Sequence, residues 1–335
     1  MENNGNNFWK GKKVLVTGGS GFIGSYVVEL LLEKKAIVSI TSFKTRGNND
    51  EDRNIAVFKD KIQIFEVNLL DMESCKEVTK GQEVVLNLAA RVGGIELNSK
   101  HQSIMFKDNL LIFMNLLEAA RQNNVLIFLT VSSACVYPQL CTIPISEEEG
   151  FKDTPAQTNE GYGWAKRMQE FLSKCYAKEY GMKIAIVRPS NAYGPKDNFD
   201  AATSHVIPAL IRRVLNGENP LVVWGSGNQT RSFLYATDFA RGLLDITENY
   251  AECDALNLGD EREVTIKELV GIILRLCNKE NEIKIVFDTS KPEGQPRRCS
   301  DVSKANKKIN YKTDVSLEEG IRSTIEWYKK ELLNK

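Results

Sequence analysis

Short apolar runs separated by stretches with helical periodicity recur through the first 190 residues of the chain. The runs are five to seven residues long and rich in valine, isoleucine and leucine, as is typical of buried strands. The expected strands cover 13–17, 36–41, 62–67, 83–88, 125–131 and 184–188. This alternation predicts an α/β fold of the Rossmann type, a doubly wound parallel sheet with helices on both faces.

After residue 190 the pattern changes to shorter strands interleaved with helices. The expected strands are 221–224, 255–258 and 283–287, and the expected helices are 206–215, 237–248, 266–276 and 317–330. We therefore predict a dinucleotide-binding domain at 1–190 and a smaller α/β substrate-binding domain at 191–335. Segments between about 230 and 260 are expected to return to the first domain.

Three glycines follow the first expected strand in the spacing G-x-x-G-x-x-G. They are Gly18, Gly21 and Gly24, and a helix begins among them, because Ile23 and Val27 recur at a helical interval. In such a turn the glycines permit a tight bend, a close approach of the backbone to a pyrophosphate, and close packing of helix and strand. The helix N-terminus adds free N–H groups and a partial positive charge. The turn therefore predicts a dinucleotide site.

The end of the second strand bears on the choice of nicotinamide cofactor. NAD sites usually place an acid about 20 residues after the glycines to hold the ribose 2′-hydroxyl, and no acid occurs between the end of the second expected strand and Asp50. Lys44 and Arg46 could instead neutralise a 2′-phosphate. The alternative is that they are two solvated surface cations. We expect NADP(H) as the cofactor.

Charge and composition exclude several classes of protein. Lys and Arg together number 44, as do Asp and Glu, so the chain lacks the basic surplus of proteins that bind nucleic acids or anionic membranes. No long apolar run or apolar signal core occurs. Seven Cys residues without a C-x-x-C pair indicate free thiols and no metal site. We expect a cytoplasmic protein with no nucleic-acid or membrane partner, and the acidic run 147–149 on a solvated face.

Two residues four positions apart, Tyr162 and Lys166, form a Tyr-x-x-x-Lys pattern. On a helix they lie on one face, so the ammonium can lower the phenol pKa and make Tyr162 a proton donor or acceptor near neutral pH. Alone, the pattern is as well explained by an exposed helix pair, because it occurs often by chance. Ser133 changes the picture, since it follows an expected strand where α/β active sites gather. We expect Ser133 to hydrogen-bond the reacting oxygen beside Tyr162.

The glycine turn together with Ser133, Tyr162 and Lys166 resembles the extended short-chain dehydrogenases/reductases over essentially the whole chain. Six further blocks are similar to the GDP-L-fucose synthase family, whose members are NADPH-dependent 3,5-epimerases and 4-reductases of GDP-4-keto-6-deoxy-D-mannose. The blocks are 90–95, 133–138, 158–162, 193–199, 204–210 and 223–227. The resemblance implies a GDP-linked 4-keto sugar as substrate and a homodimer as the assembly.

The resemblance also implies roles for matching residues. Ser133, Tyr162 and Lys166 fall on the reductase triad, while Cys135 and His205 fall on the two acid/base positions of the epimerase. The residues expected to contact the nucleotide-sugar are Arg213, Trp224, Arg231 and, with a surface position as the alternative, Arg297. The residues expected in the cofactor site are Gly18, Gly21, Phe22, Ile23, Gly24, Ser42, Lys44, Arg46, Leu69, Ala89, Ala90, Lys166, Pro189, Asn191, Ala192 and His205.

The chemistry of Cys135 and His205 agrees with these positions. A C4 ketone acidifies the protons on C3 and C5, so inversion at either carbon needs a base and an acid across the ring. Thiols and imidazoles both change protonation state near neutral pH when slightly perturbed. Only two histidines occur, and we interpret the other, His101, as a surface residue. The alternative is a histidine that merely begins a helix and a thiol that is merely a small buried side chain.

Other activities stay open at this point. A related enzyme acting on a GDP-4-keto-heptose would carry the same residues. A nucleotide-sugar 4-epimerase that keeps its NAD would share the reductase triad without requiring the Cys135–His205 pair. A 4,6-dehydratase is disfavoured, because Ala134 and Cys135 occupy the positions where such enzymes carry an acidic pair. A non-catalytic dinucleotide-binding protein is disfavoured by the intact Tyr162–Lys166 pair.

Overall fold

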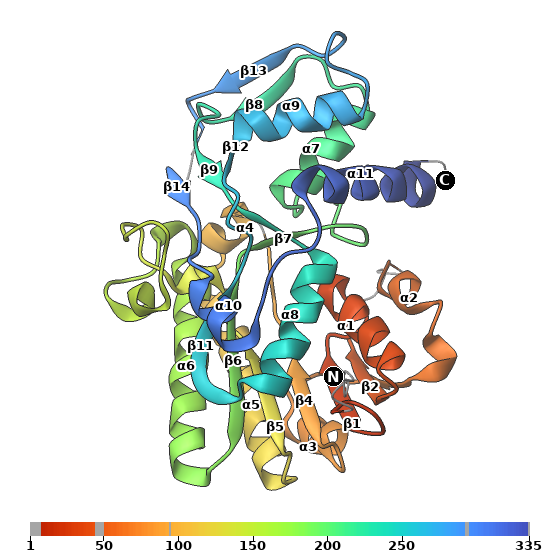
Figure 1. Cartoon of the computed structure of the whole chain (residues 1–335), viewed down its shortest axis with the longest axis vertical. Coiled ribbons are helices and arrows are strands. Elements are labelled where there is room, and N and C mark those ends of the chain that lie inside the picture. The colour runs from red at the N-terminus through yellow and green to blue at the C-terminus, as the bar shows by residue number, and fades with distance from the viewer. Residues whose placement is uncertain (1–7, 44–49, 94, 292–294, 334–335) are drawn as a thin grey trace, which may run out of the picture.

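The computed structural model describes residues 8–43, 50–93, 95–291 and 295–333 of the chain. Its centre is a seven-stranded parallel sheet in the order β11-β6-β5-β4-β1-β2-β3 (Figure 1). The strands are β1 (Lys13–Thr17), β2 (Ile37–Ser42), β3 (Gln63–Glu66), β4 (Val84–Asn87), β5 (Ile127–Val131), β6 (Lys183–Pro189) and β11 (Glu252–Leu258). The strand order reverses between β1 and β4, so the predicted Rossmann-type fold is confirmed.

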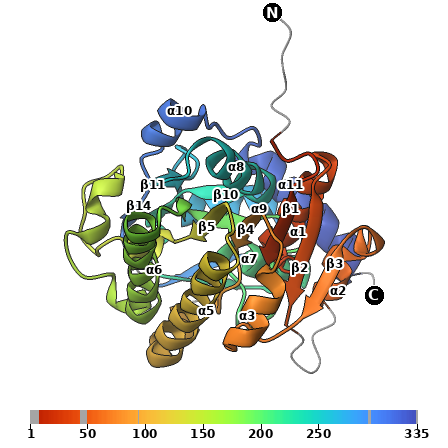
Figure 2. The ribbon, with the colours of Figure 1, turned by 90° about the horizontal axis from the view of Figure 1, so that it is seen from below.

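Helices cover both faces of this sheet (Figure 2). Successive side chains of a strand point to opposite faces, so Val14 and Val16 of β1 join one core and Leu15 joins the other. The apolar runs in the sequence therefore reflect a sheet buried on both sides. The first core is closed by α1 (Phe22–Glu33), α8 (Ala236–Asn249) and α10 (Ser303–Ile309), and the second by α3 (Met72–Thr79), α5 (Gln102–Gln122) and α6 (Glu160–Tyr180).

A second lobe with its own apolar core lies at one end of the sheet, and the chain enters it from the carboxyl end of β6 (Figure 1). Its helices are α7 (Val206–Leu215), α9 (Ile266–Leu276) and α11 (Leu317–Tyr328). Its paired strands are β7 (Asn191–Tyr193) with β10 (Phe233–Tyr235), β8 (Leu221–Trp224) with β13 (Ile285–Asp288), and β9 (Thr230–Arg231) between β12 (Val264–Thr265) and β14 (Arg297–Arg298). Two short helices, α2 (Asp50–Ile55) and α4 (Ile95–Lys100), complete the set in the described ranges. Capping boxes at Thr265 and Ser316 fix where α9 and α11 begin.

The expected elements lie within two residues of the observed bounds, with one exception. β11 begins three residues before the expected strand at 255–258. A register shift between Glu252 and Ala255, with Cys253 at φ +57°, interrupts the alternation of the strand. The bulge explains why the apolar pattern missed the first residues of β11.

Two expectations from composition can be compared with the described part of the chain. None of the helices there is long and apolar enough to cross a membrane. Nor does that part group three or more His, Cys, Asp or Glu side chains in a way that could hold a metal ion.

Candidate active site

The glycine turn joins β1 to α1 at the carboxyl edge of the sheet. Gly18 adopts φ +66° and lies against the backbone of Ala89, where a Cβ would stand 3.3 Å from the Ala89 Cα. At Gly24 a Cβ would come within 2.1 Å of the Gly18 carbonyl oxygen. Both positions therefore require glycine, one for its backbone conformation and one for the close approach of α1 to the turn.

The first turn of α1 has the features of an anion site. Gly21 caps the helix without a side-chain hydrogen bond, and the first turn contains no acidic residue. The N–H groups of Phe22, Ile23 and Gly24 therefore form the positive end of the helix dipole, and no acidic side chain of this turn neutralises it. Because this turn lies beside the point where the strand order reverses, its residues fit the diphosphate of a nicotinamide dinucleotide.

The other expected cofactor residues follow the ends of neighbouring parallel strands. Ser42 closes β2, and its hydroxyl lies 3.3 Å from that of Ser20 in the glycine turn. Leu69 follows β3, Ala89 and Ala90 follow β4, Pro189 closes β6, and Asn191 and Ala192 lie in β7. Lys44 and Arg46, on which the NADP(H) expectation depends, lie outside the described residues.

Ser133, Tyr162 and Lys166 meet where β5 ends and α6 begins. The Lys166 ammonium lies 5.5 Å from the centroid of the Tyr162 ring and donates 2.7 Å to the Val131 carbonyl oxygen at the end of β5. A side-chain hydrogen bond with Ser133 lowers the pKa of Tyr162. The structure therefore brings the three residues of the expected reductase triad together.

Burial changes the titration of this triad. It raises the pKa of Tyr162 well above that of a free phenol, the negative charge of the Cys135 thiolate acts in the same direction, and the hydrogen bond with Ser133 acts against them. Burial also lowers the pKa of Lys166 to about 8. Burial is the largest influence on the phenol, so the expectation that Lys166 lowers the Tyr162 pKa stays a prediction.

Two glycines allow the first turn of α6 to reach this position. A Cβ on Gly161 would meet the Gln102 carbonyl oxygen of α5 at 2.4 Å, and a Cβ on Gly163 would meet the Cys135 carbonyl oxygen at 2.5 Å. Tyr162 is thus carried between two backbone contacts that leave no room for a side chain on either neighbour. The sequence Gly-Tyr-Gly at 161–163 is the local signal for this packing.

Cys135 lies in a short 3₁₀ turn, Ala134–Val136, directly after Ser133. Its backbone N–H donates 3.1 Å to the Ser133 hydroxyl, so the thiol and Ser133 share one turn. The Arg298 guanidinium lies 3.8 Å from the thiol. Arg298 reaches it because the segment after β14 is bonded to the loop after Cys135, where the Ile145 N–H donates 2.8 Å to the Cys299 carbonyl oxygen.

The expected nucleotide-sugar residues lie on the second lobe, and three of them are already engaged. Arg213 donates 2.7 Å to the Glu218 carboxylate and 2.6 Å to the Val222 carbonyl oxygen. Arg231 donates 2.7 Å to the Gln295 carbonyl oxygen. Arg297 is exposed, and its Nε donates to both oxygens of the Glu263 carboxylate, at 3.0 and 2.8 Å. Trp224, the fourth residue, is 52% exposed at the end of β8. Of the two neighbouring arginines, Arg298 rather than Arg297 contacts the expected catalytic cluster.

His205 lies on the second lobe, at the start of α7. The ring is half exposed, and its Nδ1 lies 3.6 Å from the buried Asp197 carboxylate. Asp197 raises the pKa of His205 through a hydrogen bond and its charge, while partial burial acts against it. The other histidine, His101, is exposed at the start of α5, as expected.

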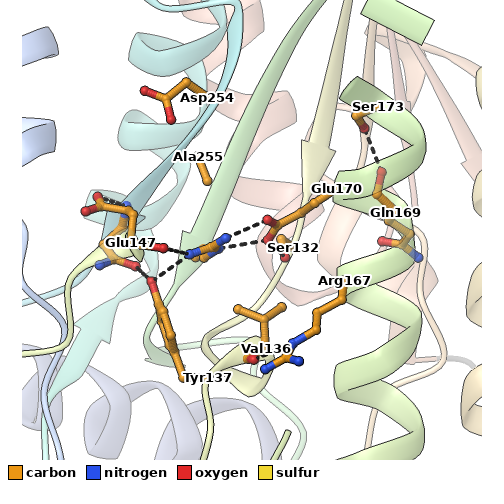
Figure 3. A network of polar contacts seen from close by, with 12 residues as sticks. Ser132, Val136, Tyr137, Glu147, Arg167, Gln169, Glu170, Ser173, Asp254 and Ala255 are labelled. Atoms are coloured by element: carbon orange, nitrogen blue, oxygen red, sulfur yellow. Dashed lines mark hydrogen bonds and ion pairs between the residues drawn. The ribbon is translucent and has the colours of Figure 1, made fainter. Parts of the chain in front are cut away.

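A buried polar network joins α6 to the neighbouring strands (Figure 3). Arg188 of β6 forks onto Glu170 of α6 with bonds of 2.8 and 2.7 Å, and the two side chains are 3% and 0% exposed. The Ser132 hydroxyl also donates to Glu170. The second amino group of Arg188 donates 3.2 Å to the Tyr137 hydroxyl. The network therefore links α6, the helix that carries Tyr162 and Lys166, to the carboxyl ends of β5 and β6.

Glu147 of the acidic run is part of this network and Glu149 is buried, so the expected solvated face is wrong for these two residues and holds for the exposed Glu148. The Glu147 carbonyl oxygen accepts 2.6 Å from Arg188, and its carboxylate accepts 2.8 Å from the Asn257 N–H. Glu149 is buried and pairs with Lys152. Partners that are distant in sequence, Arg188 and Asn257, decide this placement, and no local pattern indicated them.

Comparisons with known proteins agree with the motifs. The family model described as the NAD dependent epimerase/dehydratase family matches residues 14–259. GDP-L-fucose synthase of Escherichia coli (strain K12) is 32% identical over 332 residues, covering 95% of this chain and 96% of that protein. GDP-mannose 3,5-epimerase of Arabidopsis thaliana is 31% identical over 323 residues, covering 96% of this chain and 83% of that protein.

A solved structure gives the same answer for the fold. UDP-glucose 4-epimerase from Thermotoga maritima, with UDP-glucose, superimposes with a TM-score of 0.85 at 26% identity, covering 95% of this chain and 99% of that one. The resemblance to extended short-chain dehydrogenases/reductases is thus confirmed in both sequence and structure. The chain belongs to the NAD dependent epimerase/dehydratase family.

Proposed function

We propose that this protein is an NADPH-dependent 3,5-epimerase and 4-reductase of a GDP-4-keto-6-deoxy sugar. One observation carries the proposal: the Cys135 thiol shares a turn with Ser133 and influences the titration of both Tyr162 and Lys166. A 4-epimerase needs the triad but no thiol beside it. The similarity to GDP-L-fucose synthase and to GDP-mannose 3,5-epimerase supports the same combination of chemistries.

The reductive half uses the triad. A nicotinamide dinucleotide, held at the first turn of α1, supplies a hydride when bound. Ser133 donates a hydrogen bond to the C4 oxygen, and Tyr162 gives its phenolic proton to that oxygen as it becomes a hydroxyl. A high phenol pKa keeps Tyr162 protonated and ready to donate near neutral pH. Lys166, with its pKa lowered to about 8, is close to its protonation midpoint and can return a proton to Tyr162.

The epimerising half uses Cys135 and His205. The C4 ketone makes the C3 and C5 protons acidic, so a base on one face removes a proton and an acid on the other face returns one to the enolate. Cys135, whose sulfur lies 3.8 Å from the Arg298 guanidinium, is the proposed base. The raised pKa of His205 favours the imidazolium, which is the acidic form.

The proposed preference for NADPH depends on the positive charges of Lys44 and Arg46. Replacing both with alanine is expected to weaken NADPH binding much more than NADH binding, because only NADPH carries the 2′-phosphate that these charges would neutralise. Fluorescence titration with each dinucleotide measures the two dissociation constants. Equal losses for both would remove this part of the proposal.

The assembly is proposed to be a homodimer formed through α5 and α6. Ile104, Leu111 and Met114 recur on one face of α5 and are 41%, 38% and 44% exposed, and Phe171 of the adjacent α6 is 57% exposed. A row of large apolar side chains is typical of a covered interface. Sedimentation of the wild type and of Leu111→Lys/Phe171→Glu tests this, with a dimer expected for the first and a monomer for the second.

The activity test uses the purified chain with GDP-4-keto-6-deoxymannose and NADPH in D₂O. Loss of NADPH absorbance together with deuterium at C3 and C5 of the product is expected. Cys135→Ser is expected to slow deuterium incorporation about 100-fold or more while leaving NADPH binding intact.

Other outcomes point to the rivals. Deuterium incorporation without consumption of NADPH would indicate an epimerase without a reductase step. Conversion of UDP-glucose to UDP-galactose without added cofactor would indicate an NAD-retaining 4-epimerase. Full activity with a GDP-4-keto-heptose and none with the 6-deoxyhexose would change the sugar but not the chemistry.

A further inference from the structure

His205 occupies the N-cap position of α7 without acting as a cap. Its side chain makes no hydrogen bond to the first turn of the helix, although Ser, Thr, Asp and Asn are the residues that normally serve there. The partial positive charge of a helix N-terminus also opposes an imidazolium. A purely structural histidine would therefore be a poor choice at this position, so the ring requires another explanation.

The nearest partner of the ring is Asp197. Its side chain is only 2% exposed, and its Oδ1 lies 3.6 Å from His205 Nδ1. The Asn198 N–H donates 2.7 Å to the same oxygen, whereas Oδ2 is buried without a hydrogen-bond partner among the described residues. A buried carboxylate with so few hydrogen bonds needs a cation nearby, and the imidazolium of His205 is the cation it meets.

The loop that carries Asp197 is held in an unusual shape. Lys196 has φ +69°, a left-handed conformation that is costly for a residue other than glycine. Its ammonium lies 4.9 Å from the Tyr26 ring centroid and 3.9 Å from the Glu29 carboxylate. The Tyr26 hydroxyl donates 3.0 Å to the Pro195 carbonyl oxygen. Three contacts thus fasten the loop to α1, the helix of the expected dinucleotide site.

The charges around this loop are therefore divided into two pairs. Lys196 is balanced by Glu29 of α1, and Asp197 is the group whose hydrogen bond and charge act on the His205 pKa. We propose that Asp197 is a positioning residue for epimerisation. It holds Nδ1 of His205, so that Nε2 is the nitrogen that donates a proton to the sugar. The inference rests on the proposed function for the identity of the reaction.

The proton transfer balances as follows. Nε2 of the imidazolium gives its proton to the enolate carbon on one face of the sugar, a C–H bond forms, and the imidazole is left neutral with Nδ1–H still facing Asp197. A carboxylate in this place fixes the tautomer and the ring orientation through every cycle. Without it, the neutral ring could carry its proton on either nitrogen and turn away from the substrate.

The first test needs no substrate. Because the chain has two histidines, a His101→Gln background leaves His205 as the single imidazole in a proton NMR titration. Asp197→Asn in this background is expected to move the His205 midpoint to lower pH. Asp200→Asn is the matched control, since Asp200 lies in the same loop but is exposed and bonds only to its own turn. An unchanged midpoint in Asp197→Asn would overturn the inference.

The second test measures deuterium incorporation at C3 and C5. Asp197→Asn is expected to reduce kcat for exchange roughly 10- to 100-fold with little change in KM or NADPH affinity, and Asp200→Asn is expected to match the wild type. Adding Asp197→Asn to His205→Asn is expected to cost nothing further, because the carboxylate acts through the ring. A further loss in the double variant would show an independent role and contradict the inference.

A third variant separates charge from position and guards against unfolding. Asp197→Glu keeps the carboxylate but moves it by one methylene, so it is expected to keep a high His205 midpoint while losing exchange. Exchange at the wild-type rate in Asp197→Glu would contradict a positioning role. If the wild type itself shows no exchange, the proposed function fails, and the NMR titration still decides whether Asp197 and His205 act as a pair.

Discussion

Tyr162 and Lys166 are carried by the first turns of a long helix that is packed against backbone on two sides, whereas His205 is carried by a loop and a helix end on the second lobe. Lys166 is 4% exposed, with its ammonium bonded to a strand-end carbonyl oxygen. The His205 ring is half exposed and depends on one carboxylate.

Under the proposed function, this difference indicates how two chemistries can share one sugar. Hydride transfer needs the carbonyl, the phenol and the cofactor in one geometry, and a rigid cluster in the sheet domain provides that. Epimerisation needs groups that address two carbons on opposite faces of the ring, and a group on a separate lobe can reach the face that the sheet domain does not. The predictions below test this contrast between a rigid reductive cluster and a separately held imidazole.

The largest effect is expected from Tyr162→Phe. The ring and its packing remain, but the proton donor is lost, so reduction should fall roughly 10²- to 10⁴-fold. Deuterium incorporation at C3 and C5 should continue, because Cys135 and His205 are intact. NADPH consumption measures the rate of reduction, and mass spectrometry of the recovered sugar measures deuterium incorporation. If reduction survives in Tyr162→Phe, Tyr162 is not the proton donor and the contrast with His205 is wrong.

Glu170→Gln tests the rigidity of the reductive cluster. It leaves the buried Arg188 guanidinium without its charge partner, which is expected to reduce the free energy of unfolding by about 3–5 kcal/mol. Glu179→Gln, at an exposed position of the same helix, is expected to change it by less than about 0.5 kcal/mol. Urea denaturation of both variants provides the comparison, and equal stabilities would show that the network is not what holds α6.

Gly163→Ala tests the close approach of α6 to Cys135. The added methyl group must displace the Cys135 carbonyl oxygen, so a loss of about 1–3 kcal/mol in unfolding free energy is expected, together with slower reduction. Gly271→Ala in α9 has nothing within 4 Å of its added Cβ and should stabilise the protein by about 0.5–1 kcal/mol. If both variants lose unfolding free energy, the effect comes from replacing glycine in a helix and not from the contact with Cys135.

The final prediction concerns pH. Burial lowers the pKa of Lys166 from 10.5 to about 8, so between these values the unfolded chain binds a proton that the folded chain does not. Stability from this group should therefore rise with pH from 8 to 10.5, by up to about 1.4 kcal/mol per pH unit. Because other groups titrate in the same range, the measurement is the difference between wild type and Lys166→Met. Parallel curves would show that Lys166 is not desolvated.

The sheet could be predicted from the sequence because each buried strand shows its apolar run locally. The same holds for the glycine turn and for Tyr162 with Lys166, whose spacing fits a single helix face. Local patterns could not predict the partners of Glu147 or the contact of Arg298 with Cys135, because these join segments more than 40 residues apart along the chain. The bulge at Cys253 shows a second limit, since an irregular strand loses the alternation by which it is identified.

Arg298 has a consequence for how the protein is made. Chains leave the ribosome N-terminus first, and domains tend to fold in that order. The last strand of the sheet is complete at Leu258, but the guanidinium beside the thiol arrives only with β14. A nascent chain can thus assemble its dinucleotide-binding sheet before its thiol acquires a cationic neighbour. Cys135 gains this neighbour only after translation has passed residue 298.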